Sequence, residues 1–218
     1  MIKAAVLDME GTMLDTEKIY MIYWIKAANY YGYDMKPEHV LSIRSLAAKY
    51  AEEKLKLFFG PECNYYEIKA KRKELMKAYF DENGIEKKKG LDQFLEHLKK
   101  RGYKVAVATA TDYERTKEYL EKLDIDKYFD KIVCANMVAC GKPAPDIYIY
   151  ASEKLGLKTQ ECLALEDSQN GIKSASSAGC KTVMVPDLDG PTDDIKPLLY
   201  DVADNLCDVI RILHEGNT

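Results

Sequence analysis

The chain has 218 residues, with 32 lysine and arginine and 36 aspartate and glutamate side chains, and its net charge is −4 at neutral pH. This charge gives no electrostatic reason to expect a nucleic acid or an anionic membrane as a partner, and no apolar run approaches the roughly 20 residues that a membrane-spanning helix needs. The first residues lead directly into an apolar segment, so we expect no signal peptide and a cytoplasmic protein.

The cysteines lie apart from one another along the chain, and none forms a Cys-x-x-Cys pair. This spacing is typical of reduced, mostly buried thiols in a cytoplasmic protein rather than of a disulfide framework. The histidines are equally scattered, so the sequence offers no cluster of the kind that holds zinc. The cysteines are Cys63, Cys134, Cys140, Cys162, Cys180 and Cys207.

The first element is a short apolar run at residues 4–7, which ends abruptly at Asp8, Glu10 and Gly11. A short continuous apolar run that ends at a turn signal predicts a strand buried on both faces. Asp8 then lies just past the carboxyl end of the strand, where ligands bind in open α/β sheets. An aspartate there can act as a nucleophile or as a metal ligand. The alternative is a solvated acidic turn.

Residues 15–85 show helical periodicity and no convincing strand. The pattern predicts helices over residues 17–31, 47–59 and 65–79, with an irregular helical region that begins at residue 37 and breaks near residues 42–45. We therefore expect a small helical bundle.

From Gly90 onward, predicted helices and strands alternate. Such alternation implies a parallel sheet with right-handed crossovers. The predicted fold is α/β: a Rossmann-like parallel-sheet core of residues 1–14 and 86–218, with an inserted all-α cap of residues 15–85. The strands are expected at 103–109, 131–135, 162–165 and 181–185, and the helices at 91–100, 112–123, 145–155, 169–178 and 204–213.

Two independent domains are the alternative organisation, but a first strand without partners cannot form a domain. An insertion after the carboxyl end of a strand lies above the ligand site and commonly acts as a lid or specificity element.

Polar side chains follow four of the predicted strands. Because the carboxyl ends of parallel strands meet at one edge of a sheet, we expect these side chains to converge. Several carboxylates gathered there would repel one another unless a cation lies among them, and oxygen ligands without cysteine or histidine suit Mg²⁺. Taken singly, each has a plainer interpretation as a helix cap, a solvated lysine or an acidic first turn. The residues are Asp8, Glu10, Thr109, Thr111, Lys142, Glu166 and Asp167.

Four segments in this order resemble the four motifs of the haloacid dehalogenase superfamily. They are Asp-Met-Glu-Gly-Thr, the threonine after Val-Ala-Val-Ala, the lysine of Gly-Lys-Pro-Ala-Pro, and Glu-Asp-Ser-Gln-Asn-Gly-Ile. The resemblance covers essentially the whole chain, and it implies a fold of that superfamily. The helical insertion resembles the cap of the branch that contains β-phosphoglucomutase and phosphoglycolate phosphatase.

The resemblance implies that Asp8 is the nucleophile and forms an aspartyl-phosphate. Mg²⁺ would be held by the Asp8 carboxylate, the backbone carbonyl of Glu10 and Asp167, with Glu166 close by. Lys142 would neutralise charge on Asp8 and on the transferring group.

Substrate contacts follow from the same resemblance. Thr109 and the backbone N–H of Ala110 would hold phosphoryl oxygens, with Thr111 as a further candidate. In the cap, Arg44 is a candidate cation for the distal end of the substrate.

Two residues depart from the resembled pattern. Glu10 stands where the family usually has the aspartate that protonates the leaving oxygen, and a misplacement of about 1 Å can cost on the order of 100-fold in rate. Tyr20 stands where the sugar-phosphate mutases tend to carry histidine, which argues against mutase activity.

The favoured function is therefore a Mg²⁺-dependent phosphatase that acts on a small phosphorylated metabolite. The alternatives are a sugar-phosphate mutase of the β-phosphoglucomutase type and a weakly catalytic protein that binds a phosphorylated metabolite. We expect a monomer or a weak dimer.

Overall fold

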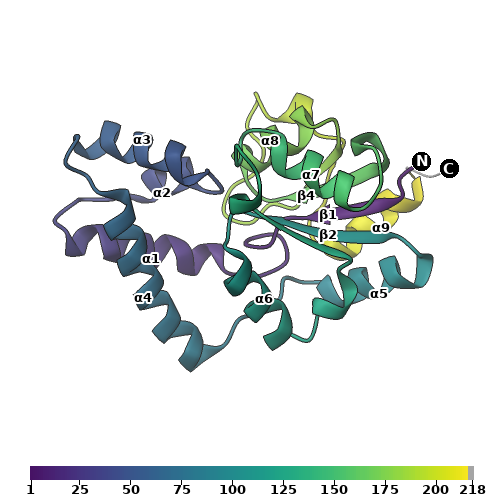
Figure 1. Cartoon of the computed structure of the whole chain (residues 1–218), viewed down its shortest axis with the longest axis horizontal. Coiled ribbons are helices and arrows are strands. Elements are labelled where there is room, and N and C mark those ends of the chain that lie inside the picture. The colour runs from purple at the N-terminus through teal and green to yellow at the C-terminus, as the bar shows by residue number, and fades with distance from the viewer. Residues whose placement is uncertain (216–218) are drawn as a thin grey trace.

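The computed structural model describes residues 1–215. Within these residues, a single six-stranded parallel sheet has the order β3-β2-β1-β4-β5-β6 (Figure 1). The expected α/β core is thus confirmed. Only β6, a strand of two residues, was not predicted, because it is too short to show a pattern. The strands are β1 (Ala4–Leu7), β2 (Lys104–Thr109), β3 (Lys131–Cys134), β4 (Cys162–Glu166), β5 (Lys181–Met184) and β6 (Asp201–Val202).

Helices cover both faces of the sheet (Figure 1). Successive residues of β1 point to opposite faces: Leu7 belongs to the apolar cluster on one side and Val6 to the cluster on the other. Both faces are therefore buried, which explains the unbroken apolar run of this strand. One face packs against α5 (Leu91–Arg101), α6 (Tyr113–Lys122) and α9 (Leu206–Glu215), and the other against α7 (Asp146–Lys154) and α8 (Gln169–Ser177).

The predicted helical insertion is present and lies to one side of the sheet (Figure 1). Helix α1 packs along α4, where Trp24 and Tyr65 stack with their ring centroids 5.7 Å apart. Helix α4 is longer than predicted and ends only at Gly84, which has a φ of +74°. The insertion contains α1 (Glu17–Tyr30), α2 (Pro37–Ile43), α3 (Ala48–Phe59) and α4 (Tyr65–Asn83).

The two segments that connect the insertion to the core run side by side. The amide of Asp15 donates to the carbonyl of Glu86 at 2.9 Å, and Leu14 forms an antiparallel bridge with Lys87. These contacts lie at the expected boundaries after residues 14 and 85. The division into a core and a cap stays a prediction.

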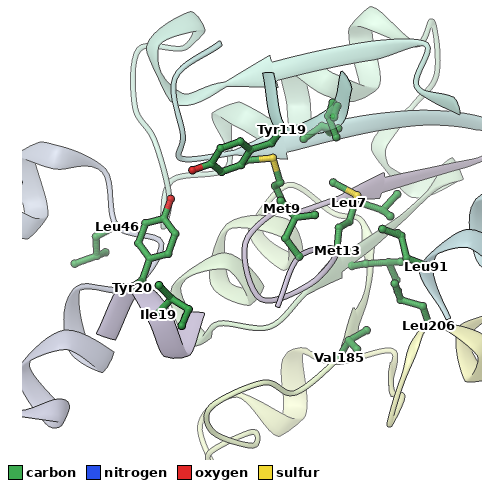
Figure 2. Packing of buried hydrophobic residues seen from close by; sticks show 14 of the residues in the cluster. Leu7, Met9, Met13, Ile19, Tyr20, Leu46, Leu91, Tyr119, Val185 and Leu206 are labelled. Atoms are coloured by element: carbon green, nitrogen blue, oxygen red, sulfur yellow. The ribbon is translucent and has the colours of Figure 1, made fainter. Parts of the chain in front are cut away.

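One apolar cluster extends from the sheet into the first helix of the insertion. Figure 2 shows Leu7 and Met13 near Leu91 of α5 and Met9 beside Tyr119 of α6, while Tyr20 of α1 points toward Tyr119. The loop that follows β1 is therefore held between the sheet and the insertion.

The register of the sheet sets the level of the predicted site residues. Leu7 pairs with Val107 of β2 and with Leu165 of β4, and the amide of Asp8 donates to the carbonyl of Leu165 at 3.0 Å. Asp8 therefore leaves the sheet at the same level as the ends of its two neighbouring strands.

None of the helices within residues 1–215 combines the length and the apolar character needed to cross a membrane. Most of the cysteines are buried, as expected. The two exposed ones are Cys140 and Cys207.

Candidate active site

Asp8 and Lys142 form a buried ion pair at the carboxyl end of β1. The Asp8 residue is 2% exposed and Lys142 is 1% exposed. The ammonium of Lys142 donates to Oδ1 of Asp8 and to the carbonyl of Ala108 at 2.9 Å, and it lies 2.6 Å from Oε1 of Glu166. The structure thus brings the predicted nucleophile and the predicted lysine into direct contact, although they are 134 positions apart in the chain.

The electrostatics of this pair favour a charged lysine. Burial by itself lowers the pKa of Lys142, but Asp8 and Glu166 outweigh burial and raise that pKa above its ordinary value. Burial raises the pKa of Asp8 well above its usual range. Lys142 opposes this rise, while the nearby carboxylates add to it. A further cation beside Asp8 would therefore favour its ionised, nucleophilic form.

Three buried carboxylates converge at this edge of the sheet. Asp8, Glu166 and Asp167 each offer an oxygen, and these oxygens lie within 4.8 Å of one another. Neither carboxylate oxygen of Asp167 accepts a hydrogen bond from any group in residues 1–215. Buried carboxylate oxygens that accept no hydrogen bond, beside two further carboxylates, form a donor set that fits Mg²⁺, which prefers oxygen ligands.

Gly11 makes room for this cluster. Its φ is +76°, and a Cβ at this position would lie 2.6 Å from Cγ of Asp167 and 2.8 Å from Cγ of Glu17. The turn after β1 therefore needs glycine both for its left-handed backbone conformation and for the close approach of Asp167.

The carboxylate of Glu166 contacts three other side chains. Besides its ion pair with Lys142, it accepts a hydrogen bond at 2.5 Å from the hydroxyl of Tyr148, a fully buried residue of α7. The hydroxyl of Ser168 donates to Oε2 of Glu166 at 3.3 Å. Sequence reasoning did not single out Tyr148, although a buried tyrosine hydroxyl generally needs a polar partner.

The carboxylate of Glu10 points away from the acidic cluster and toward β2 and α1. Its Oε1 accepts hydrogen bonds from Thr111 Oγ1 at 2.6 Å and from Tyr20 at 3.0 Å. Its Oε2 accepts one from Thr109 Oγ1 at 3.1 Å. The predicted substrate contacts Thr109 and Thr111 thus surround the predicted acid. Their role toward a phosphoryl group stays a prediction, as does the role of the Glu10 carbonyl toward the metal.

Arg44 is buried against the acidic cluster. One of its terminal nitrogens, Nη2, donates to the backbone carbonyl of Asp167 at 3.1 Å and pairs with Asp189. The other, Nη1, lies 3.6 Å from Oδ2 of Asp167. In this conformation Arg44 balances the charge of a predicted metal ligand, and its contact with the distal end of a substrate stays a prediction.

Glu17 is a further buried acid that sequence reasoning did not assign to the site. Burial raises the pKa of Glu17 to about 8, against the opposing effect of Arg44. The positive charge of Arg44 therefore favours the ionised forms of two acidic groups, Glu17 and Asp167. The sequence held little signal for this arrangement, because its members come from α1, from the loop after α2 and from the loop after β4.

A cavity of about 430 Å³ opens over Asp8 and Glu10. Its lining includes the predicted contacts Ala110 and Thr111 together with side chains of the insertion. The volume lies within the range of small-molecule pockets, which is roughly 300–1,000 Å³. The site can therefore enclose a whole metabolite between the sheet and the helical insertion.

Comparisons with known proteins identify the family of the chain. The sequence profile of the haloacid dehalogenase-like hydrolase family matches residues 5–185. The chain is 29% identical over 181 residues to the phosphorylated carbohydrates phosphatase of Thermotoga maritima, and this alignment covers 83% of each chain. It is 26% identical over 191 residues to the β-phosphoglucomutase of Bacillus subtilis, covering 84% of this chain and 83% of that one.

Solved structures show the same fold. The crystal structure of β-phosphoglucomutase from Clostridium difficile superposes with a TM-score of 0.83 at 21% identity, covering 99% of this chain and 96% of that one. The resemblance found in the four motifs and the expected fold are both confirmed. The chain belongs to the family of haloacid dehalogenase-like hydrolases.

Proposed function

We propose that the chain is a Mg²⁺-dependent phosphatase that hydrolyses a small phosphorylated metabolite, of the phosphorylated sugar type, through an aspartyl-phosphate on Asp8. The observation that carries this proposal is the buried Asp8–Lys142 pair near the carboxylate of Asp167, which accepts no hydrogen bond within residues 1–215. Asp8 also lines a metabolite-sized cavity. The family match and the phosphatase named among the relatives support the reaction class.

Asp8, Asp167 and Glu166 would hold the Mg²⁺ ion, together with the carbonyl of Glu10. The ion would supply positive charge that brings the anionic nucleophile and the anionic phosphate together. Lys142 keeps a second positive charge fixed against Asp8, so that repulsion between carboxylate and phosphate is reduced without any movement of the protein.

In the first step an Asp8 oxygen forms a bond to phosphorus, and the bond from phosphorus to the leaving oxygen breaks. The carboxyl of Glu10 gives its proton to that oxygen. In the second step a water oxygen attacks phosphorus, the bond to Asp8 breaks, and Glu10 takes the proton of the water. For both steps Glu10 must exchange one of its partners Thr109, Thr111 and Tyr20 for the substrate or the water.

A mutase is the second candidate, because one similar protein is named β-phosphoglucomutase. In a mutase, Glu10 would take the proton of a sugar hydroxyl, which then attacks phosphorus in place of water. The tyrosine at position 20, where sugar-phosphate mutases tend to carry histidine, favours the phosphatase. Conversion of β-glucose 1-phosphate to glucose 6-phosphate in the presence of a bisphosphate primer would support the mutase instead.

The test is phosphate release from a panel of phosphorylated sugars and acids by the wild type and by Asp8→Asn, with Mg²⁺ and with EDTA. We expect release only by the wild type with Mg²⁺. Asp81→Asn is the matched control, because Asp81 is an exposed aspartate of α4 paired with Lys77, and it should retain full activity. Equal release by the wild type and Asp8→Asn would refute the proposal.

A further inference from the structure

Three basic side chains line the part of the cavity formed by α4 and α6. Lys69 and Arg72 come from the insertion helix α4, and Arg115 comes from α6 of the core. A fourth basic residue nearby, Lys73, is already paired with Asp112 at 2.9 Å. We call Lys69, Arg72 and Arg115 the basic wall.

The two arginines of the basic wall are held by aromatic rings rather than by carboxylates. The guanidinium carbon of Arg72 lies 4.6 Å from the ring centre of Tyr20 and 4.5 Å from that of Trp24. Arg115 lies 5.5 Å from the Tyr20 ring, and its Nε donates to the hydroxyl of Tyr119 at 2.7 Å. Aromatic faces orient a guanidinium without neutralising it, so both groups are fixed and remain charged.

The positive charge of the basic wall is not balanced by direct ion pairs. No carboxylate within the described part of the chain forms an ion pair with any of its three members, and Nε of Arg72 is buried without a hydrogen-bond partner. Arg72 is only 6% exposed. Glu10 contributes a favourable charge to both arginines, but its oxygens already accept hydrogen bonds from Thr109, Thr111 and Tyr20.

The members of the basic wall also destabilise one another. Burial, and then the charges of Arg72 and Lys73, lower the pKa of Lys69 to about 8. Buried charges of one sign are costly unless a counter-charge reaches them. An anionic ligand in this part of the cavity would supply that counter-charge.

We propose that Lys69, Arg72 and Arg115 bind a second anionic group of the substrate, a carboxylate or a phosphate, while its scissile phosphoryl group lies at Asp8. The inference rests on the proposed phosphatase function, because that function places the phosphoryl group at Asp8. It narrows the substrate class to bisphosphates and phosphorylated carboxylic acids. Because the basic wall contains residues of both α4 and α6, the second anion would contact the insertion and the core at the same time.

The test compares matched substrates that differ in one anionic group. One pair is 3-phosphoglycerate and glycerol 3-phosphate, and the other is fructose 1,6-bisphosphate and fructose 6-phosphate. We expect kcat/KM to be at least tenfold higher for the more anionic member of one pair or of both. A preference confined to the first pair identifies a carboxylate, and one confined to the second identifies a phosphate.

Variants assign the preference to the basic wall. Arg72→Gln and Arg115→Gln should each lower the ratio of kcat/KM within a pair toward one, and Arg72→Lys should restore part of it. Lys77→Gln, an exposed change on the same helix, should leave the ratio unchanged. Because Arg72 is buried, circular dichroism checks that its variants fold, and Arg115→Gln tests the inference independently.

Calorimetry with Asp8→Asn in the presence of Mg²⁺ separates this inference from the phosphatase proposal, since binding needs no turnover. The more anionic member of a pair should bind at least tenfold more tightly. If turnover occurs but neither kcat/KM nor affinity distinguishes the members, the second anion site is refuted and the phosphatase stands. If nothing is hydrolysed, the phosphatase proposal fails and the binding comparison still decides on the anion site.

Discussion

Replacement of Gly11 by alanine should damage the site far more than its size suggests. Gly11 has a φ of +76°, and its new Cβ would lie 2.6 Å from Cγ of Asp167. Ordinary carbon–carbon contacts are about 3.5–4.0 Å, so the Asp167 carboxylate must retreat by about 1 Å. A displacement of about 1 Å at a reacting centre can cost on the order of 100-fold in rate. We expect kcat/KM to fall by this amount and the affinity for Mg²⁺ to weaken.

Gly32→Ala supplies the matched control for this prediction. Gly32 has a similar φ of +83°, but a Cβ there meets nothing within 4 Å. Both variants should lose about 1–2 kcal/mol of unfolding free energy from the left-handed conformation, and only Gly11→Ala should also lose Mg²⁺ affinity. The measurements are urea unfolding and calorimetric Mg²⁺ titration. Wild-type Mg²⁺ affinity in Gly11→Ala would refute the reasoning that the turn makes room for Asp167.

Three further predictions concern side chains in and around the site. Lys142→Met leaves Asp8 and Glu166 without their cation, so urea unfolding should show a loss of about 3–5 kcal/mol; an unchanged midpoint would contradict the buried pair. Tyr148→Phe removes the hydrogen bond from the Tyr148 hydroxyl to Glu166, and the free energy of unfolding in the same assay should fall by about 1.5–3 kcal/mol. A smaller fall than that of an exposed Tyr→Phe control would contradict a stabilising role of this hydrogen bond. Since the pKa of Lys69 is about 8 in the folded chain, below its ordinary value, the unfolded chain binds more protons between about pH 8 and 10. The unfolding free energy of the wild type relative to Lys69→Met should therefore rise with pH across that window, and a flat difference would contradict the shift.

The convergence of the predicted site residues followed from the parallel arrangement of the strands. Asp8, Lys142 and Asp167 come from distant segments, but each follows a parallel strand, and parallel strands end at one edge of the sheet. The apolar run before Asp8 and the four motifs carried this prediction. It needed no knowledge of side-chain conformations.

The partners of individual side chains could not be predicted in this way. The contact of Tyr20 with Glu10 depends on how the insertion packs on the core, and that of Arg44 with Asp189 joins loops 145 positions apart. Such pairings leave no periodic trace in the sequence. The same holds for the basic wall, whose members look like ordinary surface residues of two helices until their aromatic neighbours are known.

The adjacent entry and exit of the helical insertion have a consequence for how such chains diversify. Since Asp15 and Glu86 are hydrogen-bonded neighbours, any module whose two ends lie equally close can be spliced there without stretching the sheet. The Asp8–Lys142 pair and the acidic cluster lie outside residues 15–85, whereas Tyr20 and Arg44, which contact Glu10 and Asp167, lie within them. Recombination at this junction would therefore keep the ion pair and the acidic cluster, and it would replace the insertion side chains that contact Glu10 and Asp167.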